Sequence, residues 1–190
     1  MEDHHGHHET LRPPWPHCPG HRGLARDWRD DCRGLSRRRG RARLYLNVKS
    51  PFFLTQALYG LLKAGGAGGQ PAKVINIGSI DGQRLNPWET YSYHASKSAI
   101  LYLTKRLAAR LITDNIIVTA IAPGAFVSEM NKAARDHGDA VAQGIPAKRI
   151  GVAEDMAAAA IYLAAPSGNY VIGDTITVDG GLVHGDFKSG

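Results

Sequence analysis

The fold is decided by one stretch, Lys73–Lys97, which reads KVINIGSIDGQRLNPWETYSYHASK. Its short apolar run, Lys73–Ile77, predicts a buried strand, and Asn86-Pro87 marks the loop that follows. A long helix is predicted from about Thr90 to Ile112, because apolar residues recur there at helical spacing. These residues are Ile100, Leu103, Leu107 and Leu111. The stretch therefore predicts a strand, a loop and a helix in succession.

The same alternation continues outward on both sides. Leucines at helical spacing predict an earlier helix over about Val48–Ala64, which ends at the glycine-rich loop Gly65–Gly69. Downstream, we expect strands at Ile116–Ala122 and Asp174–Val178, and helices at Ser128–Val141 and Glu154–Ala164. Helices of these lengths between strands imply a parallel sheet covered on both faces. The predicted fold class is α/β.

Three residues suggest carbonyl chemistry. Tyr93 and Lys97 lie four residues apart on the predicted helix, so they share one face, and Ser79 stands fourteen residues before Tyr93 at the end of a strand. A neighbouring ammonium stabilises a phenolate and brings the pKa of a phenol toward neutrality. A serine hydroxyl can hold the same substrate oxygen. The trio suits interconversion of a ketone and an alcohol.

A Tyr-x-x-x-Lys pair alone is weak support, since a surface tyrosine and a solvated lysine give the same pattern. Tyr91 is a rival, but it is six residues from Lys97 and lies on another face. The context of the pair therefore decides its meaning.

In that context the chain resembles the short-chain dehydrogenase/reductase family. The resemblance rests on four motifs in family order, besides Asn47-Val48-Lys49: Asn76-Ile77-Gly78-Ser79, Tyr93 with Lys97, Ile121-Ala122-Pro123-Gly124, and Val178-Asp179-Gly180-Gly181. It covers roughly 135 of the 190 residues, from about Leu46 to Gly181. It implies a Rossmann-like, doubly wound parallel sheet, of which this chain has the carboxy-terminal portion.

The resemblance also implies catalytic roles. Tyr93 would be the general acid in reduction, and Lys97 would lower its pKa and bind the nicotinamide ribose. Ser79 would orient the carbonyl, and Asn47 would support a water-mediated proton relay. For Asn47 the alternative is helix capping at a bend of the chain.

A second group of residues is implied to bind the cofactor. Pro123 and Gly124 would form the turn beside the nicotinamide, where the backbone of Phe126 and the hydroxyl of Ser128 would hold the carboxamide. Ser128 has an alternative, or additional, role as N-cap of the next helix. Asp179-Gly180-Gly181 is expected to be structural, and no metal site is predicted.

Within the family, Asn47–Phe53 and Ile77–Gly82 look most like 3-oxoacyl-[acyl-carrier-protein] reductases of the rhamnolipid-synthesis type, which implies NADP, or NAD, as cofactor. The family's amino-terminal Thr-Gly-x-x-x-Gly-x-Gly turn binds the pyrophosphate, and nothing before Asn47 matches it. Only 46 residues precede Asn47, too few for the missing half. We therefore expect the amino-terminal cofactor-binding part to be missing.

The composition divides the chain at residue 44. Residues 1–43 hold ten arginines, no lysine, no valine and no isoleucine, which favours a disordered segment or one translated out of frame. Metal binding by its six histidines with Cys18 and Cys32, and RNA or DNA binding by its arginines, are weaker alternatives, because zinc spacing and interleaved aromatics are lacking. Residues 44–190 are predicted to form the catalytic region, with a net charge of only +2.

Two functional classes stay open. The chain is an NAD(P)H-dependent reductase of a small carbonyl substrate, or a catalytically silent fragment that associates with intact relatives. The resemblance makes the Thr90–Ile112 helix an oligomer surface and a homo-oligomer the expected state. Two cysteines and no signal sequence favour the cytoplasm, and no apolar run reaches the ~18 residues that a membrane span needs.

Overall fold

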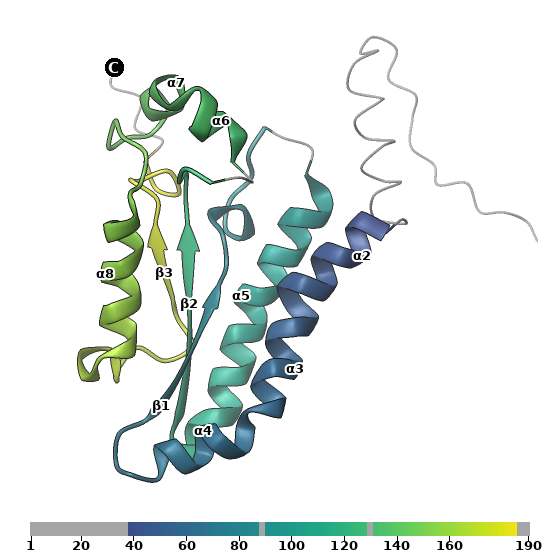
Figure 1. Cartoon of the computed structure of the whole chain (residues 1–190), viewed down its shortest axis with the longest axis vertical. Coiled ribbons are helices and arrows are strands. Elements are labelled where there is room, and N and C mark those ends of the chain that lie inside the picture. Colours follow the sequence, from purple (N-terminus) through teal and green to yellow (C-terminus); the bar gives the residue numbers. More distant parts are fainter. Residues whose placement is uncertain (1–37, 88–89, 129–130, 186–190) are drawn as a thin grey trace, which may run out of the picture.

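The computed structural model describes residues 38–87, 90–128 and 131–185 (Figure 1). Three parallel strands form one sheet in the order β1 (Ala72–Ile77), β2 (Ile116–Pro123) and β3 (Thr175–Val178). Residue 77 pairs with residue 121, and 121 with 176, so the carboxyl ends of the three strands lie at the same end of the sheet. The predicted α/β class with a parallel sheet is confirmed.

Helices cover both faces of this sheet. They are α2 (Arg38–Leu44), α3 (Ser50–Ala57), α4 (Tyr59–Gly66), α5 (Tyr91–Leu111), α6 (Lys132–Asp136), α7 (Gly138–Gln143) and α8 (Ala153–Ala164). A π-helical turn, Tyr45–Lys49, joins α2 to α3. Helix α2 and this turn pack against α5 on one side of the sheet, while α8 packs on the other (Figure 1). The molecule is thus a three-layer α/β structure.

The core lies between α5 and β2. Ile116 and Val118 of β2 are fully buried and pack with Ala108 and Leu111 of α5. Of the predicted stripe on α5, Ile100 and Leu111 are buried, while Leu103 and Leu107 are only half-buried. Inside this face Asn76 donates from Nδ2 to Thr104 Oγ1 at 2.9 Å, and this hydrogen bond ties β1 to α5.

Some boundaries differ from the predicted ones. The helix predicted over Val48–Ala64 is interrupted at Leu58, and the one predicted over Ser128–Val141 is two short helices, α6 and α7. The segment predicted to be disordered or out of frame lies outside the described residues as far as residue 37. Its last residues, from Arg38, are helical and continue into the π turn.

The outer side of β1 is an edge of the sheet. Among the described residues β1 pairs with β2 alone, and Ile77 at its end is 53% exposed. Exposed leucines occur on the neighbouring helices α3 and α4 and at the break between them: Leu54, Leu61 and Leu58. Within the described ranges, no helix is both long enough and apolar enough to cross a membrane.

Candidate active site

Three of the predicted catalytic residues, Ser79, Tyr93 and Lys97, lie near the carboxyl ends of the strands. Ser79 follows β1, Pro123 closes β2 and Asp179 follows β3. Helix α5 starts near this edge, and its first two turns carry Tyr93 and Lys97. The carboxyl ends of parallel strands are the usual ligand-binding edge of such sheets.

Lys97 is a buried cation. Its side chain lies inside α5's sheet-facing surface, the residue is only 9% exposed, and its Nζ donates to the carbonyl oxygen of Ile77 at 3.1 Å. Burial lowers the pKa of this ammonium, because the charged form loses its hydration. Nζ is 5.7 Å from the ring centroid of Tyr93, so the two predicted partners do share a face. A charge kept in this position suits a site that must stabilise negative charge on a neighbouring oxygen.

Ser79 is held close to Lys97 by the turn that follows β1. It is buried, and its Oγ accepts a hydrogen bond from Asp81 N at 3.2 Å, which caps the 3₁₀ turn Ile80–Gly82. A Cβ on Gly82 would stand 2.7 Å from the carbonyl oxygen of Lys97, so only glycine permits this approach of the turn to α5. Ser98 Oγ adds a hydrogen bond to Gly82 O at 3.1 Å.

Asn47 reaches the site through Ser96. Its Nδ2 donates to Ser96 Oγ at 3.0 Å, and that hydroxyl donates to the carbonyl oxygen of Tyr93 at 2.9 Å. Asn47 stands in the π-helical turn, a distortion that is frequent at functional sites, and its side chain bridges two helices rather than capping one. The bridge fixes the first turn of α5, which carries Tyr93.

Sequence reasoning did not single out Ser96. It is fully buried. A single serine between apolar-face positions of a helix gives no sequence pattern that predicts a functional role. The available signal was its place three residues after Tyr93, where a side chain faces the same neighbouring helix.

The turn after β2 is held by a hydrogen bond to the end of β3. Gly124 N donates to Val178 O at 2.9 Å, and the Asp179 carboxylate accepts from Gly181 N and Val183 N at 2.8 and 2.6 Å. Asp179 therefore organises a turn, in keeping with the structural role expected for it. Phe126 lies further along the same turn and pairs with Gly151 in an isolated parallel bridge.

Ser128 is exposed and uses its hydroxyl locally. Its Oγ accepts from Asn131 N at 3.0 Å, whereas Asn131 Oδ1 accepts from Ala134 N at 3.1 Å. The N-cap of α6 is therefore Asn131, and Ser128 stabilises the turn just before it.

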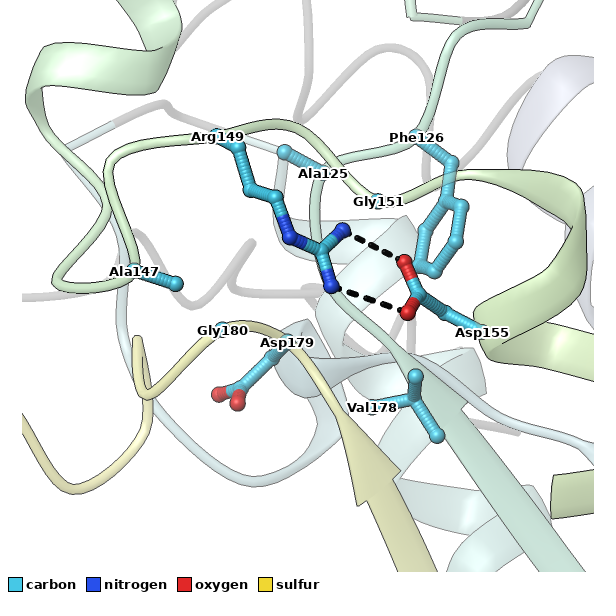
Figure 2. A pocket seen from close by; sticks show the side chains of 9 residues that line it. All are labelled: Ala125, Phe126, Ala147, Arg149, Gly151, Asp155, Val178, Asp179 and Gly180. Atoms are coloured by element: carbon cyan, nitrogen blue, oxygen red, sulfur yellow. Dashed lines mark hydrogen bonds and ion pairs between the residues drawn. The ribbon is translucent and has the colours of Figure 1, made fainter. Parts of the chain in front are cut away.

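A small cavity of about 80 Å³ lies beside this turn (Figure 2). Arg149 forms a bidentate ion pair with Asp155 at its rim, with N–O distances of 2.6 and 2.9 Å. The hydrogen bonds from Arg149, together with one from the Val152 backbone, lower the pKa of Asp155 to about 2. Phe126 lines the cavity on the side of Gly151.

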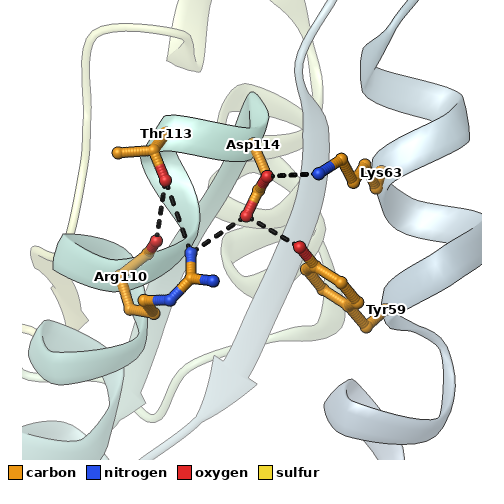
Figure 3. Close-up of polar contacts among 5 residues, drawn as sticks. All are labelled: Tyr59, Lys63, Arg110, Thr113 and Asp114. Atoms are coloured by element: carbon orange, nitrogen blue, oxygen red, sulfur yellow. Dashed lines mark hydrogen bonds and ion pairs between the residues drawn. The ribbon is translucent and has the colours of Figure 1, made fainter.

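A second polar cluster surrounds Asp114, just before β2, at the amino ends of the strands (Figure 3). The carboxylate accepts hydrogen bonds from Lys63, Tyr59 and Arg110 at 2.8, 2.9 and 3.0 Å, and they lower the pKa of Asp114 to about 2. The cluster joins α4 to the end of α5. Its place far from the strands' carboxyl ends indicates a structural role.

No cluster of three or more metal-binding side chains occurs in the described parts of the chain. The histidines and cysteines considered as metal ligands at the amino terminus lie outside those parts.

Comparison with known proteins gives one consistent picture. A family model described as "Enoyl-(Acyl carrier protein) reductase" matches residues 23–183. The rhamnolipids biosynthesis 3-oxoacyl-[acyl-carrier-protein] reductase of Pseudomonas aeruginosa is 40% identical over 142 residues, which are 73% of this chain and 56% of that protein.

Two solved structures show the same likeness in three dimensions. The Pseudomonas aeruginosa RhlG/NADP active-site complex matches with a TM-score of 0.70 and 39% identity, over 74% of this chain and 58% of that one. The 3-ketoacyl-(acyl-carrier-protein) reductase from Brucella melitensis complexed with NADH matches with 0.69 and 28%, over 76% and 58%. The chain spans about half the length of the curated relatives it matches.

Proposed function

The chain belongs to the short-chain dehydrogenase/reductase family, and on that basis we propose that it reduces a ketone to an alcohol with a nicotinamide dinucleotide. The substrate class we propose is a 3-oxoacyl compound. Its support is the 40% sequence identity with the rhamnolipid-type reductase and the fold shared with the Brucella enzyme. Because the chain spans about half of these proteins, activity must be tested on this chain itself.

The observation that carries the proposal is the buried Lys97 beside Tyr93. In a reduction, a hydride adds to the carbonyl carbon and a proton must reach the oxygen. Tyr93 Oη donates that proton, and the ammonium 5.7 Å from its ring stabilises the phenolate that remains. A buried ammonium does this better than a solvated one, since less water screens it.

Ser79 and Asn47 support this step. The Ser79 hydroxyl, at the end of β1, hydrogen-bonds the substrate carbonyl and orients it toward Tyr93. Asn47 holds the first turn of α5 through Ser96, and we assign it a further part in a water-mediated relay that returns a proton to Tyr93.

The site residues fit the nicotinamide end of a dinucleotide. Lys97 has three N–H groups and donates one to Ile77 O, which leaves donors suited to a ribose hydroxyl. The turn Pro123–Phe126 lies at the same strand edge, and its backbone with the Ser128 hydroxyl suits the carboxamide. The bound cofactor in its reduced form, NADPH or NADH, would supply the hydride.

A second candidate is favoured by the exposed edge of β1. In the described residues this strand has one neighbour, and three leucines of the α3–α4 segment are exposed: Leu54, Leu58 and Leu61. Unpaired edges and apolar faces invite association. The chain would then be a catalytically silent fragment that pairs with intact relatives.

Binding of NADPH separates the two. We expect the fluorescence of NADPH to rise on titration with the protein, and Lys97→Met to weaken that binding at unchanged far-ultraviolet circular dichroism. The matched control is Lys105→Met, which changes an exposed lysine of the same helix. No fluorescence change with the wild-type chain, at concentrations up to the millimolar range, would reject the reductase and favour the silent fragment.

We also propose a homo-oligomer formed through α5, in the cytoplasm. The support is an apolar groove between the π turn and α5, lined by Leu44, Tyr45, Val48, Lys49, Phe52 and Leu103. Tyr102, which precedes Leu103 on α5, is 74% exposed. Sedimentation should show dimers or tetramers that Tyr102→Glu dissociates; a monomeric wild-type chain would reject this assembly.

A further inference from the structure

Phe126 depends for its position on one residue of a distant loop. Gly151 N donates to Ala125 O at 3.0 Å, and Gly151 pairs with Phe126 as a parallel bridge. A Cβ at residue 151 would lie 2.4 Å from two carbon atoms of the Phe126 ring. The ring therefore rests directly on the backbone of Gly151, and any displacement of that backbone displaces Phe126.

Asp155 fixes the loop on both sides of Gly151. On the side before Gly151, the carboxylate accepts hydrogen bonds from both Nη atoms of Arg149, at 2.6 and 2.9 Å (Figure 2). On the side after Gly151, it accepts a hydrogen bond from Val152 N at 2.9 Å. One side chain thus holds residues 149 and 152 at once, with Gly151 between them. A bidentate guanidinium–carboxylate pair adds directional restraint that a single contact lacks.

Asp155 is itself firmly placed. It stands in the first turn of α8, where a carboxylate interacts favourably with the helix dipole. Helix α8 contacts all three strands of the sheet. The contacts of Asp155 with Arg149 and Val152 N, here called the clamp, therefore fix the loop relative to the sheet. The loop in turn fixes Phe126.

We propose that Asp155, acting through Arg149 and the Val152 N–H, is a positioning residue that holds the Phe126 backbone ready for the nicotinamide end of the cofactor. This rests on the proposed function, which assigns that contact to Phe126. In this role Asp155 acts on the Ala125–Phe126 segment and not on substrate or cofactor directly. Its loss leaves Tyr93 and Lys97 in place but lets the Ala125–Phe126 segment move.

Loss of the clamp should change KM for NADPH more than kcat. Loosening a cofactor-binding segment weakens cofactor binding before it affects proton transfer. Asp155→Ala should therefore raise KM for NADPH about tenfold, the effect of losing one ordinary contact in the bound state, while kcat changes by less than about twofold. Asp155→Glu, which keeps the carboxylate, should restore most of the affinity.

Asp114→Ala is the matched control. Asp114 is also an aspartate with an arginine partner and a pKa lowered to about 2, but it lies at the amino ends of the strands. It reports the general effect of losing such a pair. Arg149→Gln, at a side chain 56% exposed, is a milder variant should Asp155→Ala fail to fold, and it should act in the same direction.

Amide hydrogen exchange of Gly151 makes the test independent of activity. We expect faster exchange of this amide in Asp155→Ala and in Arg149→Gln, but not in Asp114→Ala, together with the KM effect. Unchanged exchange in both clamp variants overturns the proposal, and so does faster exchange with an unaltered KM. If the wild-type chain binds no NADPH, the proposed function fails, and the positioning role for a cofactor falls with it even where exchange shows that the clamp holds the loop.

Discussion

Removing the Ser96 hydroxyl tests how the first turn of α5 is held. Ser96→Ala deletes two hydrogen bonds, one accepted from Asn47 Nδ2 at 3.0 Å and one donated to Tyr93 O at 2.9 Å. Each contributes a net 0.5–1.5 kcal/mol at a buried site, so the free energy of unfolding should fall by about 1–3 kcal/mol. For a chain of this size, the melting temperature should drop by about 2–12 °C.

The assay is urea unfolding of Ser96→Ala, Asn47→Ala and the double variant. Both single variants remove the same Asn47–Ser96 hydrogen bond. The double variant should therefore lose about 1 kcal/mol less stability than the sum of the two single losses. Ser98→Ala is the control, since this exposed serine makes one bond, to Gly82 O, and should cost under about 1 kcal/mol. Strict additivity, or a Ser96→Ala variant as stable as Ser98→Ala, would show that the Ser96 hydroxyl does not hold the first turn of α5.

Other predictions concern the rest of the fold. The pKa of Asp114 is lowered from 3.8 to about 2, so its stabilising effect is present above pH 3.8 and is lost as the pH falls toward 2. Asp114→Asn should therefore be less stable than the wild type at pH 7 in urea unfolding, with the two converging between pH 4 and 2; a constant gap would contradict the assignment. Gly82→Ala should lower both NADPH turnover and the urea midpoint, because the new Cβ would clash with the Lys97 backbone. The new Cβ of Gly60→Ala has no atom within 4 Å, so this variant should stabilise its helix by about 0.5–1 kcal/mol. Equal urea midpoints for the two variants would contradict this. Ile121→Ala, at a fully buried side chain of the middle strand β2, should lower the free energy of unfolding by about 2–5 kcal/mol in the same assay. The exposed Ile161→Ala should lower it by about 0.5 kcal/mol, and similar losses for both variants would show that β2 is not the core.

The elements that local patterns determine could be predicted from the sequence. The apolar runs gave β1, β2 and β3 to within a residue or two, and helical spacing placed Tyr93 and Lys97 on one face of α5. These predictions succeed because burial on both faces of a strand, or on one face of a helix, repeats along the chain itself.

Features that depend on distant partners could not be predicted. The break at Leu58 lets Tyr59 Oη reach Asp114, a residue 55 positions away, and no local pattern reports that contact. The same holds for the π turn at Asn47, whose amide meets Ser96 from another helix. The contact of Asp155 with Arg149 spans only six residues, but its link to Phe126 depends on the bridge between Phe126 and Gly151, which are 25 positions apart.

Turnover by two tyrosine variants tests most directly whether Tyr93 is the general acid of a ketone reductase. The rate of NADPH oxidation with a 3-oxoacyl thioester is measured for the wild-type chain, Tyr93→Phe and Tyr91→Phe, with circular dichroism to verify folding. Loss of the proton donor should lower the rate by about 10²–10⁴-fold in Tyr93→Phe, while Tyr91→Phe, altered on another face of the same turn, stays near the wild type. Near-normal turnover in a folded Tyr93→Phe variant would contradict the account.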